Sequence, residues 1–304
     1  MSSAHRHLLG ISELSAADIA LLLDAAEKIC AGLGSSPLLE GRVIVNVFYE
    51  NSTRTLLSFE LAGKRLGAHV LNMGVERSSV AKGETLIDTA RTLAAIGADA
   101  IVLRHPQNGA PAQIAVSAGC AVINAGDGTN EHPTQALVDA LTLRRRFGRI
   151  EGLSVAICGD ILHSRVARSN MLLLTKMGAK VRMTGPSSLL PETPPPPGVS
   201  VHADMEEAIG GADAVIMLRV QHERMPAKFE LAPADYHSRY GLTHERLRLA
   251  APHAVVMHPG PINRGVEISA ELAADPVRST IFDQVALGAP VRMACLSLLL
   301  EEQP

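Results

Sequence analysis

Short apolar runs rich in β-branched residues alternate along the chain with longer segments whose apolar residues recur at helical spacing. In residues 55–68, for example, Leu56, Phe59 and Leu66 share one helical face. Such alternation predicts βαβ units and a parallel sheet covered on both faces by helices. In the first half, the pattern predicts strands within 41–50, 69–74, 98–106 and 120–128, and helices within 55–68, 83–97, 110–119 and 132–152.

A second series of alternations begins at residue 153. It predicts strands within 153–160 and 179–185 and a helix within 165–178. It also predicts a helix followed by a strand within 205–220, and a helix, a strand and a loop within 243–261. The segment 191–198 contains five prolines and is expected to be a surface loop. The C-terminal stretch 284–303 is expected to be an amphipathic helix. We therefore predict two α/β halves that meet near residues 133–150.

The size and composition fit a two-domain globular protein: 304 residues, 47% of them hydrophobic. A net charge of −3 gives no sign of a nucleic-acid face or a polybasic membrane patch, and the cluster Arg144–Arg146 is interpreted as the basic last turn of a helix. Four widely spaced cysteines without a CxxC motif indicate reduced thiols, three of them buried, in a cytoplasmic protein. No window approaches 18 continuous apolar residues, so no membrane span is predicted.

Polar side chains stand where three predicted strands end. Ser52, Thr53, Arg54 and Thr55 follow the first strand, Arg104 and His105 end the third, and a glycine-rich loop after the fourth leads to His132 and Gln135. Open parallel sheets bind ligands outside the carboxyl ends of their strands, where helix N-termini attract anions. This pattern favours a phosphate site, although Ser52 or Thr53 could simply cap a helix.

Several motifs of other enzyme classes are missing. The chain has no GxxxxGK[ST] loop, no HExxH and no Cys/His spacing suited to zinc. A dinucleotide-binding dehydrogenase, the alternative suggested by the βαβ pattern, lacks its GxGxxG fingerprint.

Seven stretches, read together, closely resemble the catalytic chains of the aspartate/ornithine carbamoyltransferase family, on the aspartate side. They are FYENSTRTLLSFELAGKRLGA, SSVAKGETLIDTARTL, IVLRHPQNGA, NAGDGTNEHPTQALVDALT, GDILHSRVARSN, LRVQHERM and MHPGPINRGVEI. The ornithine branch typically has His-Cys-Leu-Pro where this chain has His258-Pro259-Gly260-Pro261, and it lacks the RVQxER pattern found here at 219–224. These differences favour L-aspartate as the acceptor over another amino acid.

The resemblance implies a fold of two α/β domains, each a parallel sheet flanked by helices. Residues 1–132 with the C-terminal helix 286–304 would bind carbamoyl phosphate, and residues 133–285 would bind L-aspartate. The implied reaction gives N-carbamoyl-L-aspartate and phosphate in pyrimidine (UMP) biosynthesis. It needs no metal or cofactor. The family's unit is a homotrimer with shared sites, and attachment of a regulatory chain or a dihydroorotase-type partner stays open.

The resemblance also implies a role for each site residue. Ser52, Thr53, Arg54 and Thr55 would hold the phosphate, and Thr55, Arg104 and His132 the carbamoyl oxygen. The carbamoyl NH₂ would donate to Gln135 and to backbone carbonyls around Pro259, Gly260 and Pro261. Arg165, Arg219 and Gln221 would bind L-aspartate, together with Lys82 and either Ser78 or Ser79 of a neighbouring chain.

One position departs from the family pattern. Leu56 stands where the motif commonly continues with a second arginine, which could pair with Glu60 one turn along the helix. We interpret this change as a tolerated variation in local support. A catalytically silent scaffold chain, the remaining alternative, should have lost several of the site residues that are present here.

Overall fold

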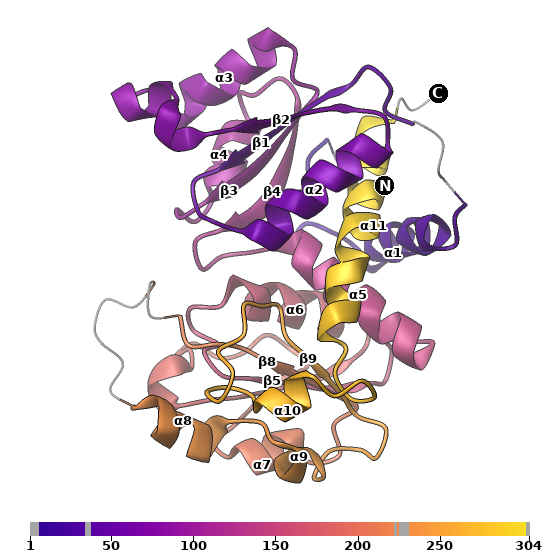
Figure 1. The fold of residues 1–304 in the computed structure, drawn as a ribbon, viewed down its shortest axis with the longest axis vertical. Helices are drawn as coiled ribbons and strands as arrows, with labels where there is room; N and C mark the ends of the chain where they lie inside the picture. Colours follow the sequence, from indigo (N-terminus) through magenta and orange to yellow (C-terminus); the bar gives the residue numbers. More distant parts are fainter. Residues whose placement is uncertain (1–5, 34–37, 222–223, 225–230, 302–304) are drawn as a thin grey trace. The chain divides into compact units, whose positions relative to one another are not determined.

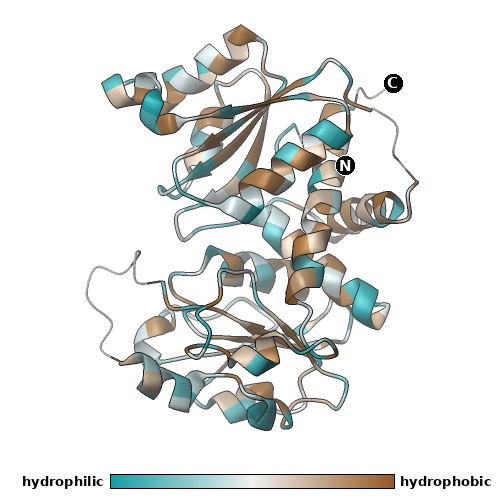
Figure 2. Ribbon diagram, viewed as in Figure 1, coloured by the Kyte–Doolittle hydropathy of each residue, from teal (hydrophilic) through white to brown (hydrophobic). Residues whose placement is uncertain are grey.

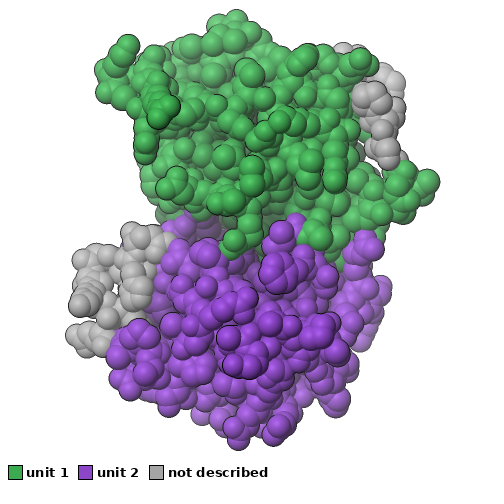
Figure 3. Space-filling view, viewed as in Figure 1, with its two compact units in different colours: residues 1–141, 286–304 green, residues 142–285 purple. Residues whose placement is uncertain are grey.

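The computed structural model describes residues 6–33, 38–221, 224 and 231–301. The chain divides into two compact units (Figure 3). Unit 1 comprises Met1–Leu141 with Ala286–Pro304, and unit 2 comprises Thr142–Val285. The boundaries lie inside helices α5 (Pro133–Phe147) and α11 (Ile281–Leu300). The assignment of one substrate to each half stays a prediction.

Unit 1 is built on a four-stranded parallel sheet in the order β2-β1-β3-β4 (Figure 1). Its strands are β1 (Val43–Phe48), β2 (His69–Met73), β3 (Ala100–His105) and β4 (Ala121–Asp127). Its helices, besides α5 and α11, are α1 (Ala16–Cys30), α2 (Thr53–Arg65), α3 (Leu86–Ile96), α4 (Ala110–Ala115) and the short 3₁₀ turns η1 (Val75–Arg77) and η2 (Ser79–Lys82).

Alternate residues of β1 face opposite sides of this sheet. Val45 and Val47 pack into an apolar cluster with α3 and α4, while Ile44 lies against Gly63 of α2 on the other face. Because both faces are covered there, β1, β3 and β4 are largely buried and hydrophobic, whereas the edge strand β2 is mostly exposed (Figure 2).

Unit 2 is a five-stranded parallel sheet in the order β7-β6-β5-β8-β9. Its strands are β5 (Ser154–Cys158), β6 (Lys180–Thr184), β7 (Val199–His202), β8 (Ala214–Met217) and β9 (Val255–Met257). Its helices are α6 (Arg165–Lys176), η3 (Ser187–Leu189), α7 (Met205–Ile209), α8 (Pro233–Tyr240), α9 (His244–Leu247) and α10 (Ala270–Ala273). The predicted architecture, two parallel sheets flanked by helices, is confirmed.

The C-terminal helix α11 differs from its predicted amphipathic form. Residues 291–297 are buried all round, so this part is a core helix rather than a surface helix. By length and composition α11 could cross a membrane. However, 61% of its most apolar 18-residue stretch is buried inside the protein, as in the core helix of a soluble protein.

Two smaller predictions from composition are confirmed. Cys120, Cys158 and Cys295 are buried free thiols. Burial raises the pKa of the Cys158 and Cys295 thiols to about 12, which keeps them protonated and unreactive. Arg144–Arg146 lie in the last turn of α5.

Candidate active site

Helix α2 begins directly after the carboxyl end of β1, at the four hydroxyl and arginine residues singled out in the sequence. Ser52 is the N-cap residue and its backbone is extended, but its hydroxyl accepts no hydrogen bond from the helix. Ser52 thus occupies the N-cap position expected from the sequence without making the side-chain hydrogen bond of a cap. The first N–H groups of a helix have no partner within it, so the start of α2 offers hydrogen-bond donors of the kind that bind anions.

The two following residues differ in burial. Thr55 is buried, with 5% of its surface exposed, whereas Arg54 is exposed at the start of the helix. Partial desolvation lowers the pKa of the Arg54 guanidinium, but an arginine stays cationic at neutral pH. The start of α2 thus combines an anion-binding helix terminus with an accessible positive charge.

Arg104 is held at the carboxyl end of β3 by both neighbouring strands. Its Nε lies 3.4 Å from Glu50 Oε2, and one terminal nitrogen donates to the carbonyl of Ala125 at 3.4 Å. In the sheet register Phe48 is opposite Arg104, and His105 is opposite Asp127. The carboxyl ends of β1, β3 and β4 therefore adjoin in one sheet, and the convergence of their side chains on one crevice stays a prediction.

His105, next to Arg104, is a packed residue. Its ring contacts Tyr49 at 4.5 Å between centroids, and its Nδ1 accepts the Gln107 N–H at 3.0 Å. Burial lowers the pKa of His105, so it is neutral at pH 7. Arg104 is the cationic group at this strand end.

The loop after β4 is fixed by hydrogen bonds before it reaches His132. Asp127 accepts from the N–H of Gly109 at 2.7 Å and of Glu131 at 3.0 Å, and Asn124 donates to Asp127 at 2.8 Å. Gly128 has φ +46°, and a Cβ there would lie 2.8 Å from the carbonyl of Pro106. Only glycine fits this turn without strain.

Glu131 anchors the same loop to the N-terminal segment. Its buried carboxylate accepts the Ile11 N–H at 2.7 Å, the Ser12 N–H at 3.2 Å and the Ser12 hydroxyl at 2.7 Å. This role could not be predicted from the sequence, because the partners of Glu131 are 119 and 120 positions away. Glu131 directly precedes the predicted site residue His132.

We expect Glu131→Ala to lower the free energy of unfolding by roughly 1–3 kcal/mol, because buried donors lose their acceptor. Urea unfolding measures this change. Glu13→Ala, an exposed carboxylate of the same segment, is the matched control and should change stability little. Equal unfolding midpoints for the two variants would contradict the anchoring role.

His132 and Gln135 stand at the beginning of α5. The carbonyl of His132 accepts the N–H groups of Gln135 and Ala136, so His132 starts the helix, and only 4% of its surface is exposed. Gln135 is half-buried, and its amide donates to Asp139 at 2.8 Å.

The segment carrying Lys82 is an exposed pair of 3₁₀ turns. Ser78 donates its hydroxyl to the Val75 carbonyl at 2.7 Å and accepts the Val80 N–H, whereas Ser79 and Lys82 are exposed. Lys82 and Ser79 are therefore accessible to a second chain, and the choice between Ser78 and Ser79 stays open.

Leu56 does not leave Glu60 without support. Glu60 accepts from Lys64 at 2.5 Å and from Asn72 of β2 at 2.8 Å, and these hydrogen bonds lower the pKa of the Glu60 carboxyl. Lys64 and Asn72 thus supply Glu60 with the hydrogen bonds that the second arginine of the family pattern could provide. This agrees with the interpretation of Leu56 as a tolerated variation.

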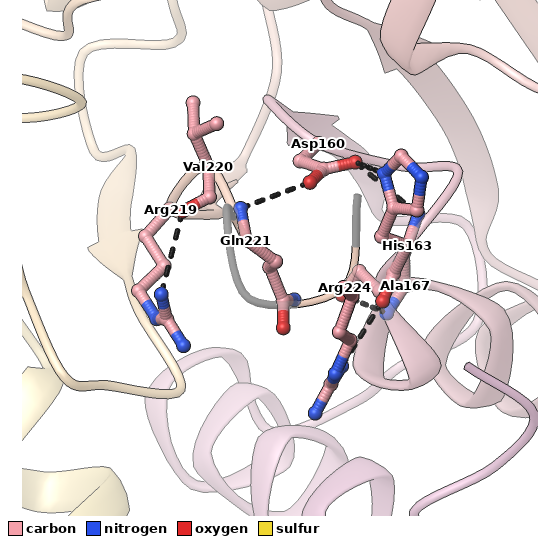
Figure 4. A network of polar contacts seen from close by, with 8 residues as sticks. Asp160, His163, Ala167, Arg219, Val220, Gln221 and Arg224 are labelled. Atoms are coloured by element: carbon pink, nitrogen blue, oxygen red, sulfur yellow. Dashed lines mark hydrogen bonds and ion pairs between the residues drawn. The ribbon is translucent and has the colours of Figure 1, made fainter. Parts of the chain in front are cut away.

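In unit 2 the loops after β5 and β8 are joined through Asp160 (Figure 4). Its fully buried carboxylate accepts the Gln221 N–H at 3.0 Å through one oxygen and contacts His163 Nδ1 at 2.9 Å through the other. Figure 4 shows Arg219, Gln221 and Arg224 extending in the same direction from this network. Sequence reasoning missed Asp160, although a carboxylate directly after a buried strand was a usable signal.

The remaining predicted aspartate ligand, Arg165, is the first residue of α6 and is buried. Its helix is capped by Ser164, whose hydroxyl accepts the Ala167 N–H at 3.1 Å. Arg219 is half-buried and donates to the Val220 carbonyl at 3.3 Å. His222 and Glu223, within the RVQxER pattern, lie outside the described residues.

Hydrogen bonds of His258 order the beginning of the loop after β9. His258 is buried, its Nδ1 accepts the Gly260 N–H at 2.8 Å, and its Nε2 contacts Glu267 Oε1 at 3.2 Å. Since Nδ1 is an acceptor, Nε2 carries the proton and donates to Glu267. These hydrogen bonds hold the beginning of the 258–261 loop, in which Gly260 and Pro261 were predicted to provide backbone carbonyls for the carbamoyl NH₂ group.

Two family models match consecutive parts of the chain. Residues 6–145 match the aspartate/ornithine carbamoyltransferase carbamoyl-P binding domain, and residues 151–299 match the Asp/Orn binding domain of the same family. The chain belongs to the aspartate/ornithine carbamoyltransferase family. The resemblance inferred from the motifs is confirmed.

A curated relative from Sphingopyxis alaskensis, an aspartate carbamoyltransferase catalytic subunit, is 56% identical over 304 residues, covering 98% of this chain and 88% of the relative. Among solved structures, aspartate transcarbamoylase from Trypanosoma cruzi in complex with carbamoyl aspartate and phosphate has a TM-score of 0.87 at 34% identity, covering 98% and 96% of the two chains. Ornithine carbamoyltransferase from Pyrococcus furiosus has a TM-score of 0.88 at 28% identity, covering both chains fully. Because both branches of the carbamoyltransferase family share this fold, the fold alone does not select the acceptor.

Proposed function

We propose that this chain transfers the carbamoyl group of carbamoyl phosphate to the amine of L-aspartate, giving N-carbamoyl-L-aspartate and phosphate in pyrimidine biosynthesis. The observation that carries the proposal is 56% identity over nearly the whole chain to an aspartate carbamoyltransferase catalytic subunit. This identity is twice the 28% identity to the ornithine carbamoyltransferase named above, which favours the aspartate branch of the family.

The start of α2 supports binding of the phosphate. Ser52, Thr53 and Thr55 would donate hydroxyl and backbone hydrogens, and Arg54 can grip phosphate oxygens as a two-pronged donor. The Ser52 hydroxyl is not used for capping, which leaves it for this purpose.

Thr55, Arg104 and His132 would donate to the carbamoyl oxygen. Negative charge grows on this oxygen as the amine attacks, so donors fixed in advance lower the barrier. The packing of Arg104 against Glu50 and the burial of His132 support such preorganisation. Gln135 and the carbonyls around Pro259, Gly260 and Pro261 would accept from the NH₂ group.

Arg165, Arg219 and Gln221 would bind the two carboxylates of L-aspartate, because guanidinium forks match carboxylate geometry. The anchoring of Gln221 by Asp160 supports this role. Attack by the amine forms the new C–N bond while phosphate leaves. We propose that the departing phosphate accepts the amine proton, so that positioning and charge neutralisation supply the catalysis.

We further propose a homotrimer in which Lys82 completes the site of a neighbouring chain. Exposed apolar residues support association: Leu57 and Leu61 lie one turn apart on α2, and Leu71 lies on the edge strand β2. The relative's description as a catalytic subunit is compatible with larger assemblies, and a regulatory or dihydroorotase-type partner stays open.

The proposal predicts turnover of carbamoyl phosphate with L-aspartate, with a kcat on the order of 1–10³ s⁻¹. L-Ornithine should be at least about 10³-fold poorer in kcat/KM, because its side-chain ammonium would meet the arginine pair that binds the second carboxylate. Phosphate release by the purified protein measures both rates. Absence of aspartate-dependent turnover would contradict the proposed reaction.

A further inference from the structure

The amide of Gln135 has a fixed orientation before any substrate binds. Its Nε2 donates to Asp139 Oδ1, one turn further along α5, at 2.8 Å. An ionised carboxylate only accepts hydrogen bonds, so the NH₂ end of the amide must face Asp139. The carbonyl Oε1 of the half-buried Gln135 is thereby turned away from Asp139.

Asp139 lies in the core of unit 1 near a buried cation. No part of Asp139 is exposed, and only 3% of Arg292, on α11, is exposed. Burial lowers the pKa of the Arg292 guanidinium to about 10, while the side chains of Cys295 and Asp139 raise it. A buried carboxylate is stabilised in its charged form by such a partner.

Arg292 is itself held by its surroundings. One terminal nitrogen donates to the Gly288 carbonyl at 3.0 Å, and the guanidinium carbon lies 5.1 Å from the ring centroid of Phe59. Phe59 is fully buried on α2, the helix that begins at Ser52–Thr55. Asp139 on α5 and Arg292 on α11 are thus linked to α2, the helix that carries the predicted phosphate site.

We infer that Asp139 is a positioning residue for the carbamoyl group: it orients the Gln135 amide so that Oε1 accepts a hydrogen bond from the NH₂ of carbamoyl phosphate. The inference rests on the proposed function, which makes Gln135 a substrate ligand. Without Asp139 the amide can rotate, and its NH₂ end would then oppose the substrate NH₂. Through Gln135, Asp139 therefore affects only the contact with the amino group of the substrate. The contacts with the phosphate and the carbonyl oxygen do not depend on it.

Acetyl phosphate separates this role from a structural one. It carries the same phosphate and carbonyl as carbamoyl phosphate, but a methyl group replaces the NH₂. Loss of the oriented acceptor should weaken the binding of carbamoyl phosphate by about three- to tenfold, which corresponds to the free energy of one hydrogen bond. Acetyl phosphate, measured as a competitive inhibitor, should keep its affinity.

The test compares Asp139→Ala and Asp139→Asn with the wild type in the full-length protein. Asp139→Ala should raise the KM for carbamoyl phosphate three- to tenfold without changing the inhibition constant of acetyl phosphate. Asp139→Asn, whose side-chain oxygen can still accept from Gln135, should recover most of the loss. In a Gln135→Ala background, Asp139→Ala should add no further selective loss. Equal losses for both phosphates, or no loss for either, would overturn the inference.

Removing Asp139 alone leaves Arg292 buried without its counter-charge and can prevent folding. The double variant Asp139→Leu/Arg292→Met removes both charges and should show the same selective loss. Asp99→Ala is the control, because Asp99 pairs with Arg42 at 2.9 Å just before β3, away from the strand ends that carry the site. Its two phosphate affinities should match those of the wild type. Wild-type turnover with L-aspartate reports on the function separately, so failure of the inference is distinguishable from failure of the proposed reaction.

Discussion

Arg54→Ala should lower kcat by about 10²–10³-fold, because the reaction would lose a cation fixed beside the departing phosphate. Negative charge builds up on the phosphate as the C–O bond breaks, so the loss is larger in the transition state than in the ground state. The effect should therefore appear mainly in kcat and less in the KM for carbamoyl phosphate. Steady-state phosphate release at saturating L-aspartate measures both.

Folding should survive this substitution. Arg54 is exposed at the start of α2, and exposed side chains outside special features usually change stability by less than about 0.5 kcal/mol. Arg65→Ala, an exposed arginine in the last turn of the same helix, is the matched control and should keep its activity. Arg54→Lys keeps the charge but loses the fork, so its kcat should be intermediate. A nearly normal rate for Arg54→Ala would mean that the phosphate binds elsewhere.

The alternation of strands and helices could be read from the sequence because parallel sheets buried on both faces require nearly continuous apolar strands. The strand β7 could not, since its four residues lie on a sheet edge and are only partly buried. The burial of α11 was also missed. Its polar residues Arg292 and Ser297 suggested a solvent-facing side of the helix in the sequence, although both side chains are buried.

The candidate site was predictable to the extent that its residues directly follow strands. Arg104 and the start of α2 stand at the carboxyl ends of adjacent strands, and periodicity places them there. The residues that hold the site were not predictable in this way. Asp160 accepts a hydrogen bond from Gln221, which is 61 positions away in the sequence. The importance of Asp139 depends on its proximity to the buried Arg292, which lies on another helix.

Mixing two inactive variants should restore activity if Lys82 serves a neighbouring chain. In a trimer with shared sites, Lys82→Ala chains still supply Arg54, and Arg54→Ala chains still supply Lys82. Random exchange of equal amounts would leave about one quarter of the sites without either lesion, because each site draws on two chains of a cyclic assembly. The mixture should therefore regain about one quarter of wild-type turnover, far above either variant alone.

The recovery must come from the shared site and not from the exchange procedure. Lys82→Ala mixed with the double variant Lys82→Ala/Arg54→Ala is the matched control, because no chain in it supplies Lys82. Subunit exchange is verified by mass labelling of one variant before activity is measured. If exchanged trimers stay inactive, Lys82 acts within its own chain or outside the site. The exposure of Lys82 on its 3₁₀ turn makes a second chain the better expectation, because within unit 1 neither an ion pair nor a side-chain hydrogen bond of Lys82 is found among the described residues.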